Sequence, residues 1–115
     1  MNLKINAIKK YLEDKKVKDV LVVDTTKLTP FYDTVIIGTA LNIRNLGTLK
    51  NNVADLAIQK GFALNHIEGK EETGWVIIDC GELVIHLFTN EERKRIELES
   101  LLTTITKKSK AKKKK

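Results

Sequence analysis

Cysteine and proline are almost absent from this chain of 115 residues, and aromatic residues make up only 5% of it. Because Cys80 is the single cysteine, an internal disulfide and a cysteine-based zinc cluster are both excluded, which is typical of proteins in a reducing cytosol. Every apolar run is far shorter than the ~20 residues that a membrane-spanning helix needs. We therefore expect a cytoplasmic protein without structural disulfides.

The positive charge of the chain is concentrated at its end. Seven lysines lie within residues 107–115, and without them the formal net charge of +6 falls to −1. We expect one domain over residues 1–105, a usual length for a single core, followed by a disordered lysine-rich tail over residues 106–115. The tail either solubilises the protein or contacts RNA through Lys107, Lys108, Lys110 and Lys112.

The hydrophobic pattern predicts three helices and five strands. Apolar residues at spacings of three and four indicate helices over residues 2–14, from a cap at Asn42 to Gly61, and from a cap at Asn90 to about residue 105. Short apolar runs indicate strands over residues 19–24, 34–38, 62–67, 75–79 and 82–88, with an exposed, mobile loop over residues 68–74. A strand, a long helix and another strand form a crossover unit, so we expect an α/β fold: a single domain with a mixed five-stranded sheet and flanking helices.

A tight hairpin is predicted between the last two strands, because only two residues, Cys80 and Gly81, separate them. This turn would set the following residues opposite one another: Trp75 and His86, Ile77 and Val84, Asp79 and Glu82. The period of two places all six on one face of the sheet. The tryptophan and histidine would build either a core or a recognition patch, and both alternatives stay open.

Residues suited to catalysis or metal binding form no recognised set. His66, Cys80 and His86 lack the short spacing of a zinc site. Three aspartates flank predicted strands: Asp24, Asp33 and Asp79. Aspartate at a strand end usually accepts a hydrogen bond in a turn, although a magnesium-dependent nucleotidyltransferase would use such a set. We expect no enzyme, no catalytic residue, no metal site and no cofactor.

A spaced pattern in the chain points to a known family. Its members are Asp33, Gly38, Arg44, Glu68-Gly69, Trp75-x3-Asp79-x-Gly81, Val84-x-His86-x-Phe88, Arg93 and Leu98-Glu99. Over residues 3–102 the chain thereby resembles the ribosomal silencing factors, also called the Iojap family. The resemblance implies a nucleotidyltransferase-like sheet without the catalytic acids. It also implies binding to ribosomal protein fourteen of the large ribosomal subunit, which blocks joining of the small subunit and represses translation.

The resemblance further implies a docking surface on the hairpin face and the last helix. Its expected residues are Trp75, Asp79, Val84, His86, Glu99 and Leu102. The chain departs from the family pattern at Ile96 and Leu102, where aromatic residues are usual, and at Asn42, where serine is usual. A nucleotidyltransferase and a small RNA-binding protein are the alternative functions, and the sequence leaves room for a homodimer.

Overall fold

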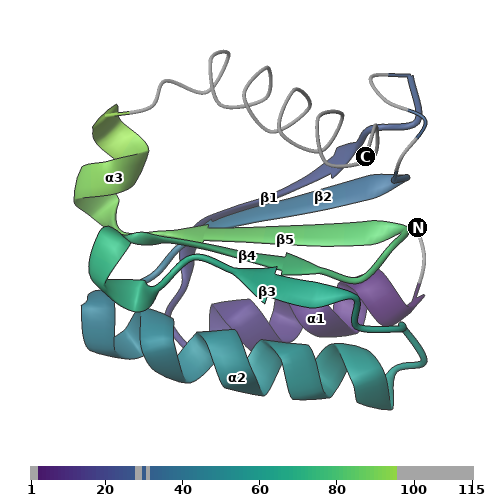
Figure 1. The fold of residues 1–115 in the computed structure, drawn as a ribbon, viewed down its shortest axis with the longest axis horizontal. Coiled ribbons are helices and arrows are strands. Elements are labelled where there is room, and N and C mark those ends of the chain that lie inside the picture. The colour runs from purple at the N-terminus through teal and green to yellow at the C-terminus, as the bar shows by residue number, and fades with distance from the viewer. Residues whose placement is uncertain (1–2, 28–29, 31, 96–115) are drawn as a thin grey trace.

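The computed structural model describes residues 3–27, 30 and 32–95 and contains a mixed α/β fold (Figure 1). Its elements, in chain order, are α1 (Leu3–Asp14), β1 (Lys18–Asp24), β2 (Thr34–Thr39), α2 (Ile43–Gln59), β3 (His66–Glu68), the 3₁₀ turn η1 (Glu71–Thr73), β4 (Trp75–Asp79), β5 (Leu83–Phe88) and α3 (Asn90–Arg95). Each predicted helix and strand therefore has a counterpart. None of the helices within these described ranges is long and apolar enough to cross a membrane.

As predicted, the five strands form one mixed sheet, and their order in it is β1-β2-β5-β4-β3. Only β2 and β5 pair in parallel, whereas the other neighbours are antiparallel. The parallel partner of β2 is thus the last strand and not the strand that follows the long helix. α2 instead carries the chain across the sheet to β3 at the far edge (Figure 1).

Both long helices lie on the same side of the sheet, below it in Figure 1. Ile8 and Leu12 of α1 and Leu49 of α2 are almost fully buried in the core on that side, together with Ile78 and Ile85 of the sheet. The alternate strand residues point to the opposite face and form a second buried cluster together with Tyr32, which precedes β2. The strand members of this cluster are Val35, Ile37, Ile77, Val84 and Phe88. The prediction that Ile77, Val84 and the other alternate residues of β4 and β5 share one face is confirmed.

The hairpin register differs from the prediction by two residues. The structure pairs Trp75 with Phe88, Ile77 with His86 and Asp79 with Val84. The cause is the turn, because Cys80 donates its backbone N–H to Leu83 O at 2.8 Å and leaves Gly81 and Glu82 as the two turn residues. A turn displaced by one residue shifts every pair by two, so the side chains within β4 and β5 keep their predicted faces. Glu82, predicted as a strand residue opposite Asp79, lies in the turn instead.

The strand after the long helix begins later than predicted, at His66 instead of residue 62. Gly61, with a φ of 96°, donates to Ile58 O, and Phe62 donates to Ala57 O, which is the hydrogen-bond pattern of a Schellman helix end. Phe62 is therefore part of the helix terminator, and its buried ring packs into the core. The expectation of a strand over residues 62–65 was wrong for this reason.

The loop predicted over residues 68–74 is more ordered than expected. Glu68 belongs to β3, and residues 71–73 form the turn η1. Lys50 of α2 holds this turn through an ion pair with Glu71, with 2.9 Å between Nζ and Oε1. This hydrogen bond is the main reason why the pKa of the Glu71 carboxyl lies below its ordinary value.

Of the two helix N-caps predicted from the sequence, the structure confirms the one of α2 but not the one of α3. Asn42 caps α2, because its side-chain oxygen accepts from Asn45 N at 2.7 Å, as predicted. α3 is capped by Thr89 instead of Asn90, since Thr89 Oγ1 accepts from Glu92 N at 3.3 Å. The predicted continuation of this helix to about residue 105 lies outside the described residues.

Candidate functional site

The hairpin of β4 and β5 carries an aromatic cluster of Trp75, His86 and Phe88. The indole Nε1 of Trp75 donates to Nδ1 of His86 at 3.0 Å. The Trp75 ring also lies against Phe88, with 4.9 Å between ring centroids, and against His86, at 5.9 Å. The prediction that Trp75 and His86 lie on one face of the sheet is confirmed. The structure shows in addition that they contact each other diagonally across the two strands.

Burial divides the predicted docking residues into two groups. Val84 and His86 are buried, at 3% and 2% exposure, whereas Trp75 is half-buried and the Asp79 side chain is 18% exposed. Trp75 and Asp79 are therefore accessible to a partner in this structure, while Val84 and His86 lie beneath the surface. Glu99, Leu102 and the tail lysines 107, 108, 110 and 112 lie outside the described residues.

Trp75 is held from its backbone as well as from its ring. Its N–H points to Thr73 Oγ1 at 3.4 Å, and the same hydroxyl lies 3.3 Å from Trp75 O. Gly69, with a φ of 84°, passes so close that an added Cβ would clash with Trp75 O. A cavity of about 150 Å³, lined by both Trp75 and Thr73, lies beside the indole. This combination suits a fixed aromatic anchor with room for a partner side chain next to it.

Asp79 closes the hairpin turn. Its Oδ1 accepts from Gly81 N at 2.9 Å and from Asn65 Nδ2 at 3.4 Å, and its Oδ2 lies 3.7 Å from His66 Nδ1. His66 is also 3.0 Å from Glu68, measured from Nε2 to Oε2. The structural role that aspartate commonly has at strand ends is thus present at this position.

The three aspartates considered as a catalytic set are only partly brought together: Asp24 and Asp33 line one cavity, and Asp79 is not among its lining residues. Asp24 ends β1 and Asp79 ends β4, three strands apart in the sheet order, which is roughly 14 Å at the usual strand spacing. Thr26 donates to Asp24 Oδ1 from its hydroxyl at 2.7 Å and from its N–H at 3.0 Å, and these bonds lower the pKa of Asp24. In the part of the chain that the structure describes, no three His, Cys, Asp or Glu side chains are placed to hold a metal ion.

Arg93 has a structural role that the sequence pattern alone did not reveal. Its Nη1 donates to Asp19 O at 2.9 Å and to Thr39 Oγ1 at 2.8 Å, which ties α3 to the ends of β1 and β2. Partial burial lowers the pKa of its guanidinium. A basic residue in the first turn of a helix is unfavourable for the helix dipole, so its position was a signal that it has a partner elsewhere.

Comparison with known proteins places the chain among ribosome-associated proteins. The profile described as "Ribosomal silencing factor during starvation" matches residues 2–115. A ribosomal silencing factor of Chromobacterium violaceum is 33% identical over 90 residues, covering 78% of this chain and 74% of that protein. A protein of Mus musculus named "Mitochondrial assembly of ribosomal large subunit protein 1" is 26% identical over 102 residues, covering 86% of this chain and 45% of that protein.

A solved structure agrees with the match in sequence. The crystal structure of a protein from Chromobacterium violaceum superimposes with a TM-score of 0.77 at 30% identity and covers 88% of this chain and 86% of that one. The similarity therefore extends over most of the fold and is not limited to the hairpin.

Proposed function

Because the chain belongs to the ribosomal silencing factor family, we propose that it binds the large ribosomal subunit and prevents the small subunit from joining it. The partner on the large subunit is ribosomal protein fourteen, and the place of action is the cytoplasm. Repression of translation then follows from steric exclusion, which needs a stable contact and bulk but no chemical step. The match to the family over residues 2–115 carries this proposal.

The docking surface is centred on Trp75, with Asp79 at its side. The half-exposed indole supplies the large, rigid apolar area that is typical of interface anchors. His86 and Val84 support it from below, and Glu99 and Leu102 extend the surface along the segment after α3. The nucleotidyltransferase-like form of the sheet, which the resemblance implies, has no part in this mechanism.

The lysine tail adds a second contact, with ribosomal RNA. Its proposed residues are Lys107, Lys108, Lys110 and Lys112 in a disordered segment over residues 106–115, next to a domain over residues 1–105. Lysine side chains that neutralise phosphates release counterions, so this contact strengthens binding mainly at low salt. The contact does not depend on RNA sequence. The domain determines where on the large subunit the protein binds, and the tail adds affinity at that place.

Sedimentation through sucrose gradients with separated ribosomal subunits tests the proposal. The purified chain should travel with large subunits only, and large subunits saturated with it should no longer form complete ribosomes with small ones. Trp75→Ala should weaken binding at least about 30-fold, which corresponds to the ~2 kcal/mol typical of an interface anchor. Folding of the variant is checked by circular dichroism at the temperature of the binding experiment.

Ile58→Ala is the matched control, because Ile58 is another large apolar residue that reaches the surface, with 50% exposure, but it lies on α2, away from the hairpin. It should bind like the unaltered chain. If folded Trp75→Ala binds as tightly as this control, the docking surface is not at Trp75. If the unaltered chain ignores large subunits, or leaves subunit joining intact when it saturates them, the proposed function itself is wrong.

A further inference from the structure

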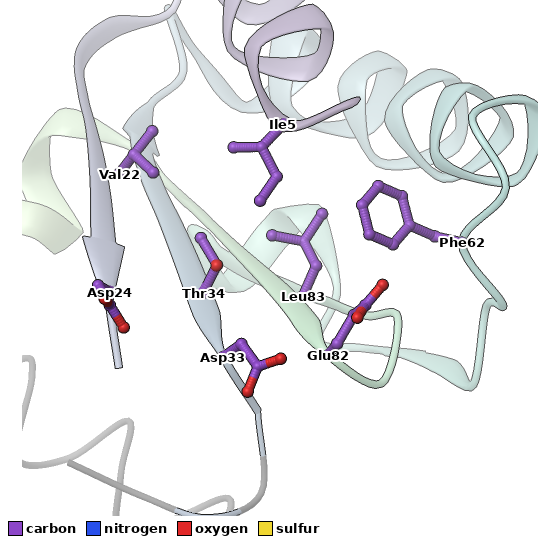
Figure 2. Close-up of a pocket in the computed structure, with 8 residues that line it drawn as sticks. All are labelled: Ile5, Val22, Asp24, Asp33, Thr34, Phe62, Glu82 and Leu83. Carbon is purple, nitrogen blue, oxygen red and sulfur yellow. The ribbon is translucent and has the colours of Figure 1, made fainter. Parts of the chain in front are cut away.

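A cavity of about 370 Å³ lies where β1 ends and β2 and β5 begin (Figure 2). Figure 2 shows four apolar side chains that line it: Ile5 of α1, Val22 of β1, Phe62 and Leu83. Its volume falls within the range of small-molecule sites. Among the described residues, neither the aromatic cluster on the hairpin nor Asp79 or Val84 lines it.

Three carboxylates surround this cavity, from Asp24, Asp33 and Glu82 (Figure 2). Backbone hydrogen bonds fix two of them relative to each other, since Asp33 N donates to Glu82 O at 2.9 Å and Thr34 N donates to the same oxygen at 3.1 Å. Neither the Asp33 nor the Glu82 carboxylate forms a side-chain hydrogen bond or ion pair with the described residues. The cavity thus combines an apolar interior with a negatively charged rim: Lys27 acts electrostatically on Asp24, whereas the carboxylates of Asp33 and Glu82 are paired with no cation among the described residues.

The two properties together select one class of ligand. A phosphate or nucleotide would meet negative charge at the rim, and a bare metal ion would gain nothing from the apolar walls. A primary amine on an aliphatic chain matches both, because its methylene groups cover apolar surface while its ammonium group stays at the charged edge. We propose that this cavity binds an alkylammonium group, with its ammonium against Asp33 and Glu82 and its aliphatic stem against Val22 and Leu83.

Two sources offer this chemistry: a free aliphatic polyamine and the chain's own lysine tail. Twenty residues follow Arg95, and fully extended they span about 66 Å, twice the longest dimension of the molecule, 33 Å. The tail can therefore reach the cavity. It carries seven lysines, and the rest of the chain has a net charge of −1, so the two attract each other. A lysine bound in the cavity would be withheld from RNA.

Titration of the full-length protein with 1,5-diaminopentane, followed through backbone amide NMR shifts, tests the site. Shifts should gather at Val22, Thr34 and Leu83, and the diamine should bind more tightly than ammonium ion or Mg²⁺ because only it covers the apolar walls. Asp33→Asn and Glu82→Gln should each weaken the diamine about two- to fivefold, as expected for one exposed ion pair. Asp55→Asn, on the exposed side of α2, should change nothing.

A full-length variant with the seven tail lysines changed to glutamine separates the two sources. If the tail occupies the cavity, this variant binds the diamine more tightly, and the amides of Val22 and Thr34 shift even without ligand. If neither changes, a free polyamine is the ligand. The proposal is overturned if the diamine binds no better than ammonium ion, or if Asp55→Asn weakens it as much as Asp33→Asn does. These outcomes do not depend on whether the chain binds ribosomes.

Discussion

Replacing Trp75 with phenylalanine isolates the hydrogen bond between Trp75 and His86. In the unaltered chain the Trp75 and Phe88 ring centroids are 4.9 Å apart, and Trp75 Nε1–H donates to His86 Nδ1 at 3.0 Å. Phenylalanine at position 75 keeps an aromatic ring against Phe88 but removes this donor. His86 is only 2% exposed, so water has little access to the acceptor that this change deprives of its donor. The change is thus mainly one of polarity, with a smaller loss of apolar area.

The cost follows from the burial of the acceptor. Leaving a buried polar atom without its partner costs ~1–3 kcal/mol, which is more than the roughly 1 kcal/mol that an average hydrogen bond contributes. We therefore expect Trp75→Phe to lower the free energy of unfolding by about 2 kcal/mol. For a domain of about 100 residues this corresponds to a fall in Tm of roughly 8 °C.

Urea unfolding followed by far-UV circular dichroism measures this loss, since Trp75 is the only tryptophan and fluorescence would not compare the two proteins. A double-mutant cycle with His86→Leu isolates the pair: the two changes together should cost about 1 kcal/mol less than the sum of the single costs. Stability of Trp75→Phe within about 0.5 kcal/mol of the unaltered chain, with no coupling to His86, would refute the importance of this hydrogen bond.

Two further predictions concern Cys80 and the tail. Burial, with a smaller effect of Asp79, raises the pKa of the Cys80 thiol from its ordinary 9.0 to about 11, so the thiol ionises first in the unfolded chain. The stability that the neutral, buried thiol contributes is complete below pH 9 and is lost as the pH rises from 9 to 11. Over that interval the urea midpoint of Cys80→Ala should therefore fall less steeply with pH than that of the unaltered chain. Equal slopes for the two proteins would contradict this. Deletion of residues 107–115 should flatten the dependence of large-subunit binding on salt, by about 0.7–0.9 in slope for each phosphate that the tail neutralises, and an unchanged slope in a salt titration would exclude the RNA contact.

The sequence predicted which face each residue of the hairpin occupies but not which residues lie opposite one another. Faces follow from the period of two, which survives a displacement of the turn. Register depends on whether the turn is formed by Cys80 and Gly81 or by Gly81 and Glu82, and glycine is favourable at either central position of the common two-residue turns. The Cys80–Leu83 hydrogen bond decides between them, and no residue type in this segment indicates it.

The start of β3 was mispredicted for a related reason. Phe62 looks like the first residue of a strand because it is apolar and follows glycine, yet its N–H completes the end of α2 by donating to Ala57 O. Its ring is then buried against the core on the helix side of the sheet. A hydrophobic residue after a helix-ending glycine is part of many Schellman motifs, so the sequence contained the signal, and the strand pattern obscured it.

The candidate site could be predicted only as a face, because exposure depends on residues that are distant in sequence. Trp75, Val84 and His86 share the predicted side of the hairpin, but only Trp75 keeps substantial exposure. The contact of Arg93 with Asp19 O spans 74 positions and follows from the geometry of the sheet, which no local pattern encodes. Local periodicity determines which way a side chain points, whereas tertiary packing determines whether a partner can reach it.

In the docking proposed above, the buried residues of the hairpin have a part, because they fix Trp75 before any partner arrives. His86 Nδ1 accepts from the indole N–H, and Phe88 packs against the ring. Thr73 Oγ1 lies within hydrogen-bonding distance of both the backbone N–H and the backbone oxygen of Trp75. Immobilising a free side chain at an interface costs about 0.5–1.5 kcal/mol, and a side chain already held in place avoids most of that cost. A change at His86 should therefore weaken the proposed ribosome binding although His86 itself is buried, because it would release the indole that we propose as the anchor.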